Sequence, residues 1–278
     1  MLGKTPGKVK AIKPMKDGVI ADFEITEEML NYFLKKALGK RMLSRPRILI
    51  CCPSNITGVE KNAIKEIAER TGAKKVFLEE EPKVAAVGAG MDISKPTGSM
   101  VIDIGGGTTD IAVLSLGGIV VSDSINIAGN AFDMRIIEYI KDKYKVIIGE
   151  STSETIKKEI GTVIKDKEQT KEVTGRSIIS GLPETLKIKS SDIMDALEED
   201  IKKIICLAKS VLEETPPELA ADIANNGIVL TGGGSLLNGL VDKLSMELKV
   251  PVLISDNPLT NVVQGTAIML DNIHLIDN

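Results

Sequence analysis

The most constraining feature of this chain is a run of three glycines set between two apolar segments. The segments Met100 to Ile104 and Ile111 to Leu116 are joined by Gly105-Gly106-Gly107-Thr108-Thr109-Asp110. Two apolar runs joined by a glycine-rich turn predict a β-hairpin. Because glycine has no Cβ, an anion can approach the backbone N–H groups of such a turn closely. The alternative is a glycine-rich hairpin turn that binds nothing.

The side chains at the edges of this turn suit a phosphate and its counter-ion. Asp103 ends the first strand, and a carboxylate there suits Mg²⁺ held through water, because this ion keeps most of its waters. Thr108 places a hydroxyl beside the same glycines. The turn therefore predicts a phosphate site.

A second glycine run, Gly232-Gly233-Gly234-Ser235, follows an apolar strand expected at Gly227 to Thr231 and opens a helix. A helix N-terminus behind such a turn suits a phosphate or the edge of a sugar. A tight strand-to-helix connection without a ligand is the alternative. No Gly-Lys-Ser/Thr follows, and neither run fits G-x-G-x-x-G with a downstream acid, which disfavours Walker and Rossmann sites.

A third motif, Glu79-Glu80-Glu81-Pro82, lies between a short strand at Lys75 to Leu78 and a helix. Three adjacent acids repel one another, so one of them is expected to orient a water while the others are solvated. The alternative is a set of acids that complement the dipole of the helix N-terminus.

Outside these motifs, strand-like and helix-like patterns alternate, which predicts α/β layers around a largely covered sheet. Thr26 is expected to cap one helix, and Thr57 with Glu60 to form a capping box at the next. A third strand is expected at Ile125 to Ala128, followed by a helix over 131–144.

The second half begins with residues 150–192, which are charged and rich in small residues and predict a small inserted subdomain. A long amphipathic helix follows, with its apolar residues on one face: Ile193, Leu197, Ile201, Ile204, Ile205, Ala208, Val211 and Leu212. A strand is expected at Pro251 to Ser255, and a closing helix at Thr260 to Asp271.

Composition excludes several classes of protein. A formal net charge of -4 argues against a whole-surface nucleic-acid binder. No apolar run approaches the roughly 20 residues of a membrane span, and no signal peptide opens the chain. The three cysteines have no metal-binding spacing and are expected to be reduced thiols of a cytoplasmic protein. The single histidine, His274, disfavours histidine-based catalysis.

The order of the motifs carries more information than any one of them. Glu-Glu-Pro, Asp-x-Gly-Gly-Gly-Thr and Gly-Gly-Gly-Ser are followed by a late glycine in Val263-Gln264-Gly265-Thr266-Ala267. This order resembles the actin/Hsp70/sugar-kinase superfamily, which holds ATP between two domains. The segments Pro14 to Asp22, Thr215 to Leu219 and Gly227 to Leu237 narrow the resemblance to the MreB/Mbl family of bacterial actins, over essentially the whole chain.

The resemblance implies an α/β, actin-like two-lobe ATPase fold with RNase H-like sheets. It also implies ATP and Mg²⁺ as cofactors and a role for individual residues. Asp103 resembles the phosphate-2 aspartate near the metal, and Glu81 with Thr108 resembles the pair that positions the attacking water. Gly105, Gly106 and Gly107 match the loop at the β- and γ-phosphates, and Gly232, Gly233 and Gly234 match the adenosine side. Lys209 and Glu213 match positions near the adenine and ribose.

The chain departs from the family at its start. The family begins with an Asp-x-Gly-Thr hairpin, the phosphate-1 loop, whereas Met1-Leu2-Gly3-Lys4 resembles a later part of the family. The first lobe is therefore expected to be N-terminally truncated, through a fragment, a misplaced start or a shortened paralogue. Residues 1–95 with 262–278 form this lobe. Residues 96–131 with 193–261 form the second lobe, and 132–192 a small subdomain.

The parent function implied by the family is ATP-dependent polymerisation into membrane-associated filaments that guide cell-wall synthesis and determine cell shape. The implied partners are other copies of the chain, the inner membrane surface, and cell-wall elongation proteins such as RodZ, MreC and MreD, with no nucleic acid. Whether this chain hydrolyses ATP is left open. The alternatives are a nucleotide-deficient scaffold or fragment, and another ATPase or kinase of the superfamily.

A basic segment with two apolar residues predicts the membrane contact. Met42 and Leu43 are ringed by Lys35, Lys36, Lys40, Arg41, Arg45 and Arg47. Apolar side chains insert at the headgroup boundary while basic ones attract anionic lipid. The family resemblance places a membrane-inserting loop here, on a protein peripheral to the inner face of the membrane. The alternative is a basic surface loop whose two apolar residues pack inward.

Overall fold

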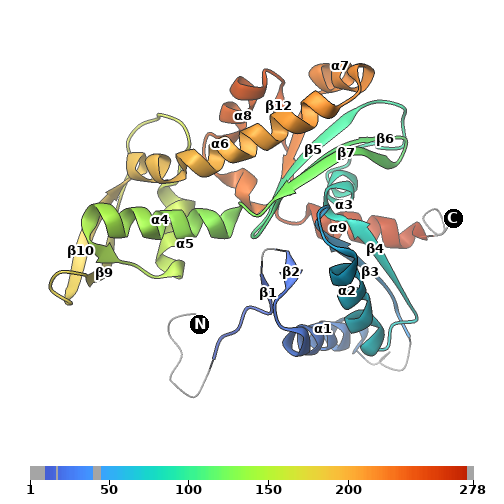
Figure 1. Ribbon diagram of the computed structural model, residues 1–278, viewed down its shortest axis with the longest axis horizontal. Helices are drawn as coiled ribbons and strands as arrows, with labels where there is room; N and C mark the ends of the chain where they lie inside the picture. The colour runs from blue at the N-terminus through green and yellow to red at the C-terminus, as the bar shows by residue number, and fades with distance from the viewer. Residues whose placement is uncertain (1–9, 17, 40–44, 274–278) are drawn as a thin grey trace.

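The computed structural model describes residues 10–16, 18–39 and 45–273, and its largest element is a five-stranded mixed sheet (Figure 1). The strand order is β12-β11-β5-β6-β7. The first glycine run joins β5 (Ser99–Ile104) to the antiparallel β6 (Thr109–Ser115), which confirms the predicted hairpin. On the other side of β5, β11 (Ile228–Thr231) and β12 (Val252–Ile254) run parallel to it.

The strand predicted at Ile125 to Ala128 is wrong, because β7 occupies Gly118–Ile125. The reason lies in the turn before it. Leu116 and Gly117 both have positive φ values, 52° and 77°. Two such residues form the tight turn whose twist matches a β-hairpin, so the next strand begins at once.

Helices cover both faces of this sheet. Alternate residues of β5 point to opposite sides, since Met100, Ile102 and Ile104 join the main core whereas Val101 packs with α3 (Glu81–Gly88). The main core also contains α4 (Gly129–Tyr144) and α6 (Ser190–Glu214), whose apolar face is the predicted one. Two shorter helices, α7 (Pro217–Asn226) and α8 (Leu240–Leu248), complete this side.

A second part of the molecule is built on the parallel pair β3 (Arg47–Cys52) and β4 (Lys75–Glu80), joined by α2 (Gly58–Arg70). The capping box of Thr57 and Glu60 at α2 is confirmed. The cap predicted at Thr26 is wrong: α1 (Phe23–Leu38) is capped four residues earlier, where the Asp22 side chain accepts a hydrogen bond from Ile25 N. Thr26 is buried inside the helix, and its hydroxyl donates to Asp22 O.

The C-terminal helix α9 (Asn261–Asp271) crosses α3 at very short range. A Cβ on Gly88 would lie 1.8 Å from Asn261 O, and one on Gly265 would lie 2.0 Å from Val84 O. The late glycine of the motif order is therefore required by the helix crossing. The same crossing places the end of α3, at Gly88, against Asn261, where the chain arriving from β12 enters α9.

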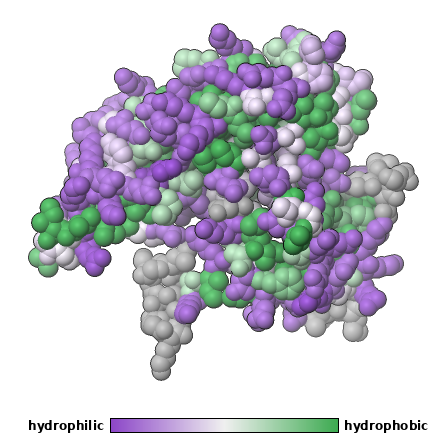
Figure 2. All heavy atoms as spheres, in the orientation of Figure 1, coloured by the Kyte–Doolittle hydropathy of each residue, from purple (hydrophilic) through white to green (hydrophobic). Residues whose placement is uncertain are grey.

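A small unit projects from the far end of the molecule (Figure 1). It contains α5 (Glu150–Ile160) and a three-stranded sheet of β8 (Val146–Ile147), β9 (Thr170–Ser177) and β10 (Pro183–Lys189). Its outer tip exposes an apolar cluster, visible in Figure 2, that includes Ile178, Ile179 and Leu182. The proposed division of the chain into two lobes and this small subdomain stays a prediction.

A short hairpin of β1 (Met15–Lys16) and β2 (Val19–Ile20) lies between the two larger parts (Figure 1). In the described ranges, no helix combines the length and the apolar character that crossing a bilayer requires.

Candidate functional site

A large cleft of about 1430 Å³ brings together segments that are far apart in the sequence. Its lining includes both glycine runs, Glu81, Asp103, the start of α4 and one face of α5. Three of the predicted motifs therefore meet around one cavity. Thr108 is buried beneath it and is not part of the lining, because the β1–β2 hairpin covers it: a Cβ on Gly18 would lie 3.2 Å from Thr108 Cγ2.

The first glycine turn leaves open space where side chains would be. A Cβ on Gly105 would meet only Thr108 O, at 3.4 Å, and one on Gly106 only the Asn130 side chain, at 3.9 Å. Packing within the protein thus does not require glycine at these two positions. A ligand that approaches the backbone does require it, which favours the anion-binding interpretation over a plain hairpin turn.

The second glycine run has a different reason to exist. Gly232 has a φ of +81°, and a Cβ there would lie 2.2 Å from Ile104 O. One on Gly234 would lie 2.3 Å from Ile104 Cγ2. These two glycines let the turn after β11 press against the end of β5. The two glycine runs thereby form adjacent parts of one cleft wall.

Three carboxyl groups gather at the base of the cleft. Asp103 and Asp110 are directly paired across β5 and β6, so their side chains share one face of the sheet. Burial, and then the nearby carboxylates of Glu81 and Asp110, raise the pKa of Asp103 to about 8. Burial followed by Asp110 raises the pKa of Glu81 to about 7. Burial also raises the pKa of Asp110, against the hydrogen bond that Ser54 N donates to it at 3.1 Å.

The carboxyl cluster fits a hydrated cation. Asp103 Oδ1 is buried and has no hydrogen-bond partner among the described residues. Among the residues that the structure describes, no three acidic, histidine or cysteine side chains lie close enough together to bind a metal directly. An ion bound through its own waters needs no such closely spaced set, and Mg²⁺ is the ion that retains its waters in this way.

Of the three adjacent acids, only Glu81 lines the cleft. Glu79 forms an ion pair with Lys83 at 3.1 Å. Glu80 precedes α3 without capping it through its side chain. This placement is compatible with the water-positioning role predicted for Glu81, which stays a prediction.

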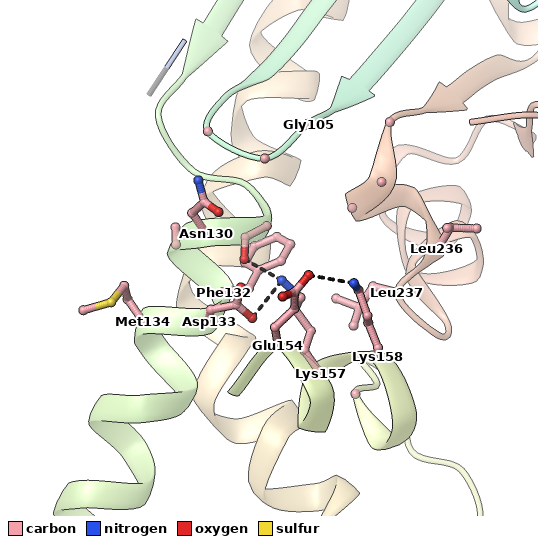
Figure 3. Close-up of a pocket in the computed structure, with 18 of the residues that line it drawn as sticks. Gly105, Asn130, Phe132, Asp133, Met134, Glu154, Lys157, Lys158, Leu236 and Leu237 are labelled. Carbon is pink, nitrogen blue, oxygen red and sulfur yellow. Dashed lines mark hydrogen bonds and ion pairs between the residues drawn. The ribbon is translucent and has the colours of Figure 1, made fainter. Parts of the chain in front are cut away.

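The structure does not bring Lys209 and Glu213 to the cleft, since neither lines it. Both belong to α6, and Lys209 forms an ion pair with Glu247 of α8 at 3.2 Å. Helix α5 forms part of the cleft wall, with Glu154, Lys157 and Lys158 toward the cavity (Figure 3). Sequence reasoning missed these residues, although their i, i+3, i+4 spacing places them on one helical face.

Figure 3 shows how this wall is held. Lys158 pairs with Glu154 at 2.6 Å within α5, and Lys157 reaches Asp133 of α4 at 2.8 Å. Leu236 and Leu237 follow the second glycine run and, with Leu259, add apolar surface to the cleft. The cavity therefore has two different ends. One is formed by the first glycine turn, which has no side chains, and by the carboxyl groups next to it; the other combines the charged side chains of α5 with the apolar leucines.

The predicted membrane residues Met42 and Leu43 lie outside the described residues. Near them in the chain, α1 exposes Tyr32 and Phe33, whose rings make an edge contact with centroids 5.6 Å apart. Lys35 and Lys36 in the last turn of α1 are also exposed.

The chain is similar over its whole length to known proteins. The MreB/Mbl protein family model matches residues 1–278. Cell shape-determining protein Mbl of Bacillus cereus is 60% identical over 274 residues, which are 98% of this chain and 82% of the relative. Cell shape-determining protein MreB of Escherichia coli is 48% identical, over 99% of this chain and 80% of the relative.

Solved structures agree. The structure of MreB5 of Spiroplasma citri bound to ADP matches with a TM-score of 0.93 and 42% identity, covering 99% of this chain and 84% of the other. A structure of the same protein bound to AMPPNP matches with the same TM-score. The MamK double helical filament, at 22% identity and a TM-score of 0.79, shares the fold. The actin-like α/β fold predicted from the sequence is confirmed.

Proposed function

The chain belongs to the MreB/Mbl family of bacterial actins, and on this premise we propose that its cleft binds ATP and that the nucleotide supports assembly into filaments. Its high identity to named cell shape-determining proteins makes it a bacterial actin-like protein of the cell-shape class. The nucleotide proposal rests chiefly on one observation. The uncrowded Gly105–Gly106 backbone lies beside a buried Asp103 oxygen that has no partner among the described residues.

The two ends of the cleft suit the two ends of ATP. The phosphates would lie against the first glycine turn, where Asp103 would hold a hydrated Mg²⁺ through the waters of the ion. That ion would neutralise charge on the β- and γ-phosphates. The nucleoside would lie toward α5, where Glu154 can accept hydrogen bonds from ribose hydroxyls and the leucines after the second glycine run can pack on the base.

Glu81 is the residue we propose to position the attacking water. It lies at the start of α3, on the cleft wall, and its pKa of about 7 is well matched to accepting a proton near neutrality. Thr108 backs the same turn from below, through its backbone oxygen, which accepts a hydrogen bond from Gly105 N at 2.9 Å.

Glu81→Gln in the same chain tests this assignment. We expect the dissociation constant of ATP with Mg²⁺ to change less than threefold, because the side chain keeps its size and lies at the water rather than at the nucleotide. Single-turnover phosphate release should fall about a hundredfold relative to the parent, in line with the loss of one general base. Loss of ATP binding with unchanged turnover of the bound fraction would contradict the role.

Assembly is tested by sedimentation with ATP, with ADP and without nucleotide. We expect the pelleted fraction to be largest with ATP. Filaments that form equally well without nucleotide, in a chain that does not bind ATP by calorimetry, would favour the nucleotide-deficient scaffold instead.

We further propose that the filaments lie on the inner face of the cell membrane and guide cell-wall synthesis with elongation proteins such as RodZ, MreC and MreD. The support is the family membership and the basic, apolar segment that contains Met42 and Leu43. A single segment of this kind binds lipid weakly, and many copies along a filament bind firmly.

A further inference from the structure

The first turn of α4 is docked on the first glycine turn. Gly129 N donates to Gly105 O at 3.1 Å, and Asn130 N donates to Gly106 O at 2.8 Å. The N-terminus of α4 faces the cleft, yet its first two N–H groups are already used. Its contribution to the site is therefore to hold the glycine turn, since these two donors are not available to an anion.

The docking fixes the direction of two other N–H groups. In a trans peptide, the carbonyl of one residue and the N–H of the next point in opposite directions. Because Gly105 O and Gly106 O point at α4, the N–H groups of Gly106 and Gly107 point away from it. Neither donates to another described residue, and both residues line the cleft.

One side chain secures this arrangement from behind. Lys157 of α5 donates from Nζ to Gly129 O at 2.6 Å and lies 2.8 Å from Asp133 Oδ1 (Figure 3). Its side chain and that of Asp133 are each only 14% exposed. A Cβ on Gly129 would lie 3.3 Å from Gly105 O and 3.5 Å from Lys157 Nζ, so glycine here lets the three groups converge.

The seam between α4 and α5 holds Lys157 in place. The buried Ser153 hydroxyl of α5 donates to Asp133 O at 2.7 Å. Burial raises the pKa of Asp133, and the hydrogen bond with Lys157 opposes this. The neighbouring Lys158 differs: its pair with Glu154 stays within α5, and its side chain is 68% exposed.

We propose that Lys157 is a positioning residue, whose ammonium group fixes the first turn of α4 and through it aims the Gly106 and Gly107 N–H groups at the phosphates. It links the small α5 unit to the phosphate turn without contacting the phosphates itself. The inference rests on the proposed nucleotide function for its ligand, but the mechanical link exists in the free protein and is tested there first.

The first test uses hydrogen exchange, followed by NMR, on the nucleotide-free chain. Lys157→Met should speed exchange of the Gly129 and Asn130 amides about tenfold, because their hydrogen bonds to the glycine turn loosen. Lys158→Met is the matched control, with the same charge lost one residue away, and should leave both amides unchanged. Unchanged exchange in Lys157→Met, or equal acceleration in both variants, overturns the proposal.

Should Lys157→Met fail to fold, Asp133→Asn serves in its place. It keeps the shape of the side chain but removes the charge that holds the ammonium, and it should accelerate the same two amides to a smaller extent. No acceleration in this folded variant overturns the proposal as well.

The second test separates a phosphate effect from a nucleoside effect, using inorganic tripolyphosphate and adenosine as probes. Lys157→Met should weaken tripolyphosphate binding about tenfold, and by a larger factor than it weakens adenosine binding. A loss confined to adenosine would mean that Lys157 acts on the nucleoside and would overturn the proposal. If the parent chain binds neither probe, the nucleotide function fails, while the exchange experiment still decides the link between Lys157 and the turn.

Discussion

At the scale of single residues, the carboxyl cluster dominates the energetics of the cleft. Asp103 and Asp110 are buried, Glu81 is partly buried, and each of the three has a raised pKa. For a carboxyl group, a pKa higher in the folded state than in the unfolded one means that ionisation favours unfolding. The destabilisation therefore begins near the ordinary carboxyl pKa of about 4 and grows until the pH passes about 8.

Asp103→Asn should consequently stabilise the nucleotide-free chain, and more so at high pH. The amide has the same shape and carries no charge, so we expect its advantage to grow by about 2 kcal/mol between pH 5 and pH 8. Urea unfolding at the two pH values measures this. The same variant should bind ATP with Mg²⁺ more weakly. A variant less stable than the parent at pH 8 would show that the cluster is not under electrostatic strain.

Residues whose role follows from a local pattern could be chosen from the sequence, and those whose role depends on tertiary contacts could not. Asp103 and the first glycines stand in one short motif, and the structure places them on the cleft wall. The roles of Lys209 and Glu213 were inferred from matching positions in the family, and in the structure Lys209 pairs with Glu247 of α8 instead of lining the cleft. Lys157 reaches the site only because α5 packs on α4, which no local pattern reveals.

At the scale of elements, the start of a helix or strand could be predicted where one strong local signal was present. It could not be predicted where two signals competed. The capping box at Thr57 is confirmed because both of its bonds lie within four residues. At α1, Asp22 and Thr26 are both residue types that cap helices, and the earlier one is used: Asp22 accepts from Ile25 N, whereas the Thr26 hydroxyl donates to Asp22 O inside the helix. The position of β7 was predicted wrongly because the turn before it contains Leu116 in a left-handed conformation, and leucine rarely occupies such a turn position.

The α3–α9 crossing yields a prediction at this scale. Gly265→Ala places a methyl group within contact distance of the α3 backbone, and backbone atoms cannot move aside as a flexible side chain can. We expect a loss of about 3 kcal/mol in the free energy of unfolding, measured by urea denaturation. Gly58→Ala at the start of α2 is the matched control, because its Cβ meets nothing within 4 Å and should leave stability nearly unchanged. Equal effects of the two substitutions would contradict the close crossing.

At the scale of the whole molecule, the cleft is built from chain segments that lie far apart in the sequence and are brought together by the fold. Glu81 reaches it from β4, the second glycine run from β11, and α5 from the small unit, and only the sheet order brings them together. The α/β class followed from the alternation of elements, and the specific actin-like arrangement followed from the order of the motifs. The lobe boundaries proposed from the sequence stay predictions.

The membrane contact is also a property of the whole assembly, because one weak segment acts many times along a filament. Replacing Met42 and Leu43 with Ser should reduce co-sedimentation of ATP-assembled chain with vesicles of anionic lipid by at least about threefold, since the apolar insertion is lost while the surrounding charges remain. Ile179→Ser with Leu182→Ser is the matched control, because this pair is exposed at the far tip of the molecule. Pelleting without vesicles reports polymerisation separately. Equal vesicle binding by parent and the Met42–Leu43 variant, at equal polymerisation, would assign the membrane contact to another surface.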